Sequence, residues 1–337
     1  MFSRNTGCRV MECVWKGMKT VVLENELLRV EILADKGTDI VEFRYKPADV
    51  DFMFRSRIPV YEFPKMIPSM PGKTGNFMDY FPGGWQEIFP NAGGPCEYKG
   101  ALLGLHGEVA LLPWEYRILE DSPKRIAVRF SIVTCRLPFR VEKTVTLEAN
   151  SPALVLEETV TNLAGEPMEF MWGHHPAFGK PFLSGDCVIR IKKASVMVAP
   201  GDGESFSNLK QGAATWPFVP GSAGGKVDIS KCPAEKDNVS EIMFLTDLAE
   251  GSYEIVNRKI KAGFRLEFPK SVFKTLWFWR VAGGSYHYPW FGMNYNVALE
   301  PFSGLPNLAD SVQRGDALKL APGKHICATV TATAVES

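Results

Sequence analysis

Residues 141–148 read Val-Glu-Lys-Thr-Val-Thr-Leu-Glu, an alternation of apolar and polar side chains with a period of two. Successive side chains of a strand point to opposite faces, so this pattern is typical of a strand with one buried face. Similar runs, rich in β-branched and aromatic residues, recur at 20–33, 125–134, 153–163, 187–199, 241–247, 252–257, 263–268, 275–279 and 326–335. The sequence offers no convincing amphipathic helix. It therefore predicts an all-β fold, a large sandwich of antiparallel strands.

Glycine and proline together account for 54 of the 337 residues, a density that indicates many turns between short strands. No linker, charge block or change in composition divides the chain, which favours a single domain over residues 1–337. Segments 58–100 and 200–237 are rich in Gly, Pro, Ser and Asn. We expect them to be long loops that either carry function or are mobile.

The charge is balanced, with 38 basic and 38 acidic side chains, so no net field attracts nucleic acid or an anionic membrane. No apolar stretch reaches the roughly 18 residues of a spanning helix, and the N-terminus has no signal-peptide core. Seven cysteines without a C-x-x-C pair argue against a zinc ribbon or a disulfide framework. We expect a soluble cytoplasmic protein, a monomer or homodimer, that binds neither nucleic acid nor membrane.

Three of the five histidines lie in distinctive contexts: His106 in LGLHGEVALLPW, and His174 and His175 in WGHHPAFG. Adjacent strand residues point to opposite faces, so at most one of the pair is expected to face a given pocket. Pro176 is expected to end the strand, leaving a histidine at a strand-to-loop mouth. The alternative for each is a buried, hydrogen-bonded structural ring. No H-x-H or H-E-x-x-H spacing supports a metal site.

Glu300 closes the apolar strand NVALEP at its predicted end and precedes a proline. A carboxylate at the end of an apolar strand is partly desolvated, which raises its pKa and makes it a better base near neutral pH. The alternative is a surface glutamate at a strand terminus.

Six blocks of the chain resemble the galactose mutarotase-like superfamily of aldose 1-epimerases and hexose-6-phosphate 1-epimerases. They follow in the order typical of that family and together extend from about residue 20 to 335: 22–46, GGWQEIFPNAGG (83–94), LHGEVALLPW (105–114), VTNLAGEPMEFMWGHHPAF (160–178), NVALEPFSGLP (296–306) and 318–334.

The resemblance implies a β-supersandwich and an isomerase that interconverts the α and β anomers of a sugar without metal or cofactor. His175 would protonate the ring oxygen, and Glu300 would take the proton of the anomeric hydroxyl. This scheme needs the two groups on opposite sides of the ring. His106 would hydrogen-bond the sugar near the ring oxygen, and His174, which the family motif does not require, would contact substrate, orient His175 or pack beneath Trp172.

Two departures from the family pattern bear on the substrate. Phosphate-binding members carry an arginine soon after the LHG histidine, whereas Glu108 stands in that region here, which disfavours a phosphorylated sugar. The arginine of the galactose-type Asn-Arg-Ile block is also missing. Gln86, Glu87 and Asn91 are predicted to replace it as contacts to neutral hydroxyls.

Four further side chains are candidates for contacts to the sugar. Trp279 or Trp290 offers a stacking platform, with Arg280 bonding hydroxyls, and the alternative is that these aromatic side chains pack in the core. Asp247 aligns loosely with a sugar-binding aspartate of the family. The alternatives to an epimerase are a non-catalytic carbohydrate-binding protein on the same fold and a carbohydrate-active enzyme of another reaction type.

Overall fold

The computed structural model describes residues 6–56, 77–200 and 206–336, and within these ranges nearly all of the regular secondary structure is β-strand. One large antiparallel sheet has the order β1 (Arg9–Trp15), β2 (Met18–Glu24), β3 (Leu28–Leu33), β4 (Asp39–Tyr45), β6 (Trp85–Ile88), β14 (Gly173–Phe178), β24 (Tyr295–Phe302), β23 (Thr275–Ala282), β20 (Val239–Thr246), β16 (Ser195–Val198), β17 (Gly212–Thr215), β18 (Phe218–Pro220) and β19 (Lys226–Asp228), with β5 (Val50–Asp51) paired to β4.

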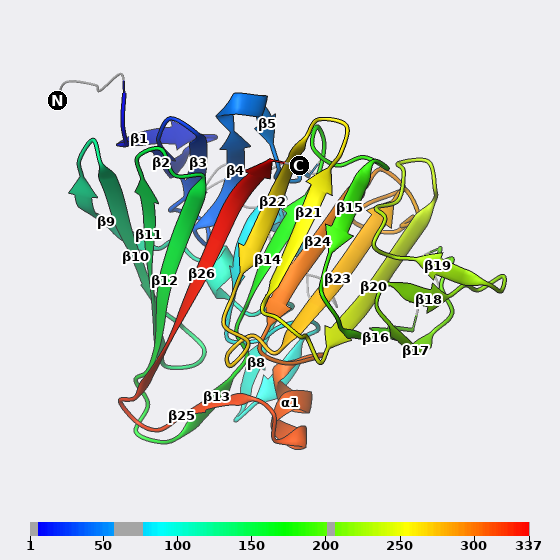
Figure 1. Cartoon of the computed structure of the whole chain (residues 1–337). Helices are drawn as coiled ribbons and strands as arrows, with labels where there is room; N and C mark the ends of the chain where they lie inside the picture. Colours follow the sequence, from blue (N-terminus) through cyan, green and yellow to red (C-terminus); the bar gives the residue numbers. More distant parts are fainter. Residues whose placement is uncertain (1–5, 57–76, 201–205, 337) are drawn as a thin grey trace.

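A second antiparallel sheet packs against the first (Figure 1). Its order is β15 (Cys187–Arg190), β21 (Ser252–Asn257), β22 (Ala262–Glu267), β26 (His325–Glu336), β12 (Ala153–Asn162), β11 (Phe139–Glu148), β10 (Arg125–Val133) and β9 (Glu115–Asp121).

Smaller elements gather at one end of the molecule (Figure 1). They are the two-stranded sheets β13 (Met168–Phe170) with β25 (Leu318–Leu320) and β7 (Cys96–Tyr98) with β8 (Ala101–Leu103), and helix α1 (Leu308–Arg314). Three 3-10 turns complete the described part of the chain, at Lys46–Ala48, Met78–Tyr80 and Val109–Leu111. The prediction of an all-β antiparallel sandwich is confirmed.

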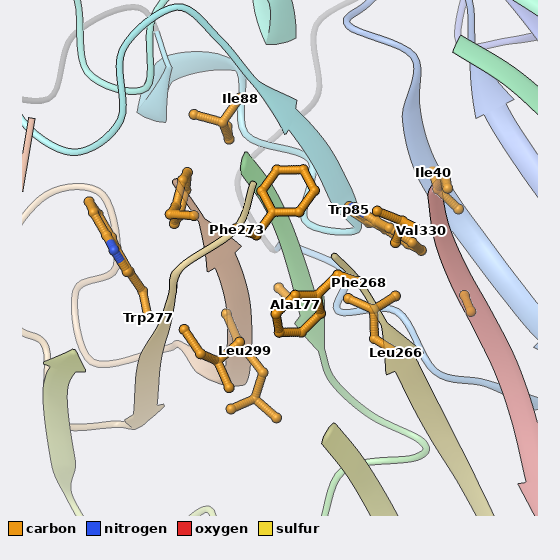
Figure 2. Packing of buried hydrophobic residues seen from close by; sticks show 14 of the residues in the cluster. Ile40, Trp85, Ile88, Ala177, Leu266, Phe268, Phe273, Trp277, Leu299 and Val330 are labelled. Atoms are coloured by element: carbon orange, nitrogen blue, oxygen red, sulfur yellow. The ribbon is translucent and has the colours of Figure 1, made fainter. Parts of the chain in front are cut away.

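The alternating pattern that predicted strands also explains the core. On β12 and β20 every second residue is buried, and the buried faces meet between the sheets. Figure 2 shows side chains of both sheets, among them Trp85 and Val330, in this space. The central strands β14 and β24 differ, because all of their residues are buried. Their outer-face side chains, which include His175 and Glu300, are therefore also shielded from bulk solvent.

Two expectations about strand ends are wrong. Pro176 and Pro301 both lie inside strands, so His175 and Glu300 are interior residues of β14 and β24. Pro176 has no N–H to donate, and the pairing of β14 with β24 is interrupted between Gly173 and Ala177. Pairing with β6 continues through Pro176, so the strand persists despite the proline.

The segments expected to be long loops, 58–100 and 200–237, contain short strands: β6 and β7 in the first, and β17, β18 and β19 in the second. Residues 57–76 and 201–205 of these segments lie outside the described residues. In the part of the chain that the structure describes, no helix is long and apolar enough to cross a membrane.

Candidate active site

The register of the central strands places His175 and Glu300 side by side. Gly173 of β14 pairs with Phe302 of β24, and Ala177 pairs with Ala298, so His175 stands directly across from Glu300. His175 Nε2 lies 3.5 Å from Glu300 Oε1, and both side chains are buried. The two groups therefore lie next to each other. The expectation that they would lie on opposite sides of a sugar ring, with a ring-sized gap between them, is wrong.

A cavity of about 600 Å³ opens over this pair. Its lining includes His106, His175, Glu300, Trp277, Trp279 and Trp290. On β23, Trp277 pairs with Glu300 and Trp279 with Ala298, so both indoles project from the same face as the carboxylate. A pocket with aromatic walls and a few convergent polar groups is typical of a small-molecule site.

His106 is held at the cavity wall by a tight turn. Its φ is +58°, and Gly107 follows at φ +74°, where a Cβ would lie 2.3 Å from the carbonyl oxygen of Phe89. His106 Nδ1 accepts the backbone N–H of Gly93 at 3.2 Å. In the neutral ring the proton is therefore on Nε2, so that nitrogen is a hydrogen-bond donor. Burial and the neighbouring His175 lower the pKa of His106, which favours this neutral form.

Burial shifts the pKa values of the His175–Glu300 pair in opposite directions. It lowers the pKa of His175 to about 4 and raises the pKa of Glu300 well above its ordinary value. Each shift disfavours the charged form, so both favour a neutral imidazole beside a protonated carboxyl group. His175 Nδ1 is buried, and no described residue is its hydrogen-bond partner. The pair can thus pass one proton in either direction between the two side chains and a ligand.

Aromatic rings surround the two cavity histidines. Phe77 packs edge-on against His106 at 4.6 Å between ring centroids, and Phe81 packs against His175 at 5.5 Å. These rings keep the imidazoles from water and explain why burial dominates their pKa values.

Residues 15–333 match the family described as Domain of unknown function (DUF4432). The chain belongs to the DUF4432 family. No curated protein sequence is significantly similar to it.

Solved structures show which fold this DUF4432 protein has. A Klebsiella pneumoniae protein provisionally assigned as an aldose 1-epimerase superimposes with a TM-score of 0.74 at 15% identity, over 96% of this chain and 82% of that protein. A galactose mutarotase-like protein of Clostridium acetobutylicum gives 0.68 at 15% identity, over 98% and 99%. A galactose mutarotase related enzyme of Lactobacillus acidophilus gives 0.63 at 17% identity, over 94% and 97%. The fold is galactose mutarotase-like, as predicted.

The structure brings five of the predicted site residues of this DUF4432 protein together at the cavity: His175, Glu300, His106, Trp279 and Trp290. Their contacts with a substrate stay predictions. The other six do not line the cavity.

His174 and Glu87 lie on the opposite face, between the sheets. His174 Nδ1 accepts the Trp85 indole N–H at 3.2 Å, and its Nε2 lies 3.0 Å from Glu158 Oε2. Glu87 accepts the Trp172 indole N–H at 2.5 Å and lies 3.2 Å from Lys143 Nζ. The prediction that adjacent histidines face opposite ways is confirmed.

Acceptor atoms of Glu87, Glu158 and His174 lie within 4.8 Å of one another, close enough to hold a metal ion. The Lys143 ammonium already supplies a positive charge there, and His174 has both ring nitrogens engaged. The set is therefore better suited to joining the sheets than to binding a cation.

The remaining predicted residues have local partners. Asn91 donates to the carbonyl oxygens of Gly94 and Gly104 and accepts the N–H of Leu308. Gln86 shares the face of His175 but donates to the carbonyl oxygen of Gly83.

Arg280 and Asp247 complete the set. Arg280 is buried and donates to Glu241 at 2.5 Å from the face opposite Trp279. Asp247 is exposed beyond the end of β20.

Sequence reasoning missed the rings of Phe77 and Phe81, because they follow a Gly- and Pro-rich segment without periodicity. Their one signal is local: two phenylalanines, in FMDYFPGG, directly precede the GGWQEIFP block.

Proposed function

We propose that this protein is an aldose 1-epimerase that interconverts the α and β anomers of a neutral sugar by proton transfer. The observation that carries the proposal is the His175–Glu300 pair, 3.5 Å apart and buried beneath an aromatic cavity. The galactose mutarotase-like fold supports the proposal by analogy with the solved structures that share it.

The close spacing of the pair suits the chemistry of an anomeric centre. The ring oxygen and the anomeric hydroxyl are bonded to the same carbon, so an acid and a base must reach two neighbouring atoms. In the proposed opening step, the proton of the pair first passes from Glu300 to His175 across their 3.5 Å separation. Protonated His175 then donates to the ring oxygen while the Glu300 carboxylate accepts the hydroxyl proton. The ring C–O bond breaks, and an open-chain aldehyde forms.

Ring opening leaves neutral His175 and protonated Glu300, the distribution that burial favours for this pair. Rotation about the bond next to the aldehyde exposes its other face. Closure then runs the two proton transfers in reverse and gives the other anomer. His106 Nε2–H, whose position follows from the Gly93 contact to Nδ1, can donate to a sugar oxygen throughout.

The lining of the cavity supports a neutral substrate. Among the cavity-lining residues of the described chain, none is a lysine or arginine that could pair with a phosphate. Glu108 accepts the backbone N–H groups of Cys135 and Arg136, so it caps a neighbouring turn.

Anomer exchange measured by NMR saturation transfer across a panel of free aldoses tests the proposal. Catalytic amounts of protein are expected to accelerate exchange of at least one aldose. His175→Ala and Glu300→Gln should each slow it by about 10²- to 10⁴-fold. The matched controls His325→Ala and Glu267→Gln, both exposed on the second sheet, should leave it unchanged. Tight sugar binding without exchange would favour a binding protein instead.

A further inference from the structure

The candidate active site continues beyond its own cavity. A second cavity of about 250 Å³ adjoins it toward the edge of the large sheet. Ser240, Ile242 and Trp279 line both cavities, so the two adjoin without an intervening element among the described residues. The far wall of the second cavity comes from Val198–Pro200, at the end of β16, and from Ser207, Leu209 and Gln211.

The first cavity is already larger than one sugar ring requires. A hexose has about 12 non-hydrogen atoms, and at the roughly 30 Å³ that liquid water allots to each molecule these occupy less than about 400 Å³. One ring bound at His175 and Glu300 would thus leave part of the 600 Å³ cavity and all of the second one unfilled.

The spacing between strands sets where a second sugar unit, linked to the one at His175 and Glu300, would lie. Neighbouring strands are about 4.8 Å apart, so β20 lies roughly 10 Å from β24 across β23. A pyranose with its anomeric carbon at Glu300 would extend over β23, where Trp277 and Trp279 project. Its far end would then reach β20, whose open face carries Ser240 and Ile242.

The second cavity offers polar groups without net charge. The Glu241 carboxylate lies on the face opposite Trp279, where it is paired with Arg280 at 2.5 Å and accepts Ser207 Oγ and the N–H of Asn208, each at 2.9 Å. Ser240, on the same face as Trp279, and Gln211 supply a hydroxyl and an amide to the wall. Half-buried Trp279 stands between the cavities with part of its indole exposed. Hydroxyl-bonding groups beside an indole suit a neutral saccharide.

We propose that the ring anomerised at His175 and Glu300 is the reducing-end unit of a disaccharide or longer oligosaccharide, and that the next unit occupies the second cavity. This inference rests on the proposed epimerase function. Because the anomeric carbon must be free, the linkage is at the end of the ring remote from it, as in 3- or 4-substituted aldoses.

Saturation transfer with glucose, maltose, cellobiose, lactose and laminaribiose tests the proposal. At least one disaccharide is expected to have a kcat/KM roughly tenfold or more above that of glucose. Exchange of glucose at a rate equal to or above that of every disaccharide overturns the inference and leaves the epimerase function standing. Exchange of none of the sugars, in this set or in the aldose panel, overturns the epimerase function and the inference with it.

Ala199→Trp separates the two cavities experimentally, because Ala199 lines only the second one. The ratio of disaccharide to glucose kcat/KM is expected to fall about tenfold or more in this variant. Val133→Trp, exposed on β10 of the other sheet, is the matched control and should leave the ratio unchanged. An unchanged ratio in a folded Ala199→Trp protein would contradict a second unit at this place.

Discussion

Two buried side chains that share one proton define the candidate site at the scale of single residues. His175 has a pKa near 4, and burial raises the pKa of Glu300 above its ordinary value. Between these limits one member of the pair is protonated and the other is not, which is the state that proton relay requires.

The pH dependence of kcat/KM should therefore be bell-shaped. Below about pH 4 both groups carry a proton and no base is left; above the raised pKa of Glu300 neither does and no acid is left. Anomer exchange rates across the pH range, corrected for the uncatalysed reaction, measure this. An acid limb near pH 6.5, the ordinary pKa of histidine, would contradict the proton assignment.

Glu158 gives a second prediction at this scale. Burial and the Glu87 carboxylate raise the pKa of Glu158 to about 7, although His174 and Lys143 oppose the shift. The folded protein keeps this proton where the unfolded chain loses it, so the contribution to stability is full below about pH 4.5 and is lost by about pH 7. Between about pH 4.5 and pH 7, the free energy of unfolding of wild type should fall by roughly 1–3 kcal/mol relative to that of Glu158→Gln.

Urea unfolding at several pH values measures that difference. Glu157→Gln, exposed on the same strand, is the matched control and should follow wild type. A constant offset between wild type and Glu158→Gln from pH 4.5 to 8 would refute the raised pKa.

At the scale of elements, the loops around the cavity depend on Asn91. Its side chain joins the loop after β6, the chain before His106 and the start of α1 through contacts of 2.8 to 3.0 Å. Since Asn91 is fully buried, removing its amide leaves backbone groups without partners.

Asn91→Ala should lower the free energy of unfolding by about 2–4 kcal/mol in the absence of sugar. Gln313→Ala, exposed on α1, serves as the control and should change it little. Thermal or urea unfolding decides the matter. Unchanged stability with a raised KM would instead favour the direct sugar contact that the sequence predicted.

Sequence patterns predicted the elements best where alternation was strong. The runs at 125–134, 153–163 and 252–257 coincide with β10, β12 and β21 to within one residue at each end. The strands β17, β18 and β19 have three or four residues each. These are too few for an alternation of apolar and polar side chains to be recognised in the sequence.

The site was harder to predict, because its geometry depends on register. The resemblance selected His175 and Glu300, but only pairing across β14 and β24 sets their 3.5 Å separation. Alternation predicted that His174 and His175 face opposite ways, but only pairing across β14 and β6 shows that His174 is the one between the sheets, beside Glu87.

At the scale of the whole molecule, a buried polar cluster joins the two sheets behind the candidate site. Glu87 and His174 come from the large sheet, and Lys143 and Glu158 come from the second one. Burial alone would raise the pKa of Glu87, but Lys143 and His174 hold it at about 2. His174 precedes His175 on β14, so the docking of the sheets and the position of the strand that carries His175 are coupled.

Lys143→Met should destabilise the protein by about 3–5 kcal/mol, because it leaves the Glu87 carboxylate buried without its ammonium partner. The double variant Lys143→Met with Glu87→Gln removes the uncompensated charge and should recover part of this loss. Urea unfolding of wild type, both single variants and the double variant completes a double-mutant cycle, which gives the coupling free energy between the two side chains. Lys124→Met, away from the sheet interface, controls for the substitution itself. Losses that simply add in the double variant would mean that the pair does not hold the sheets together through its charges.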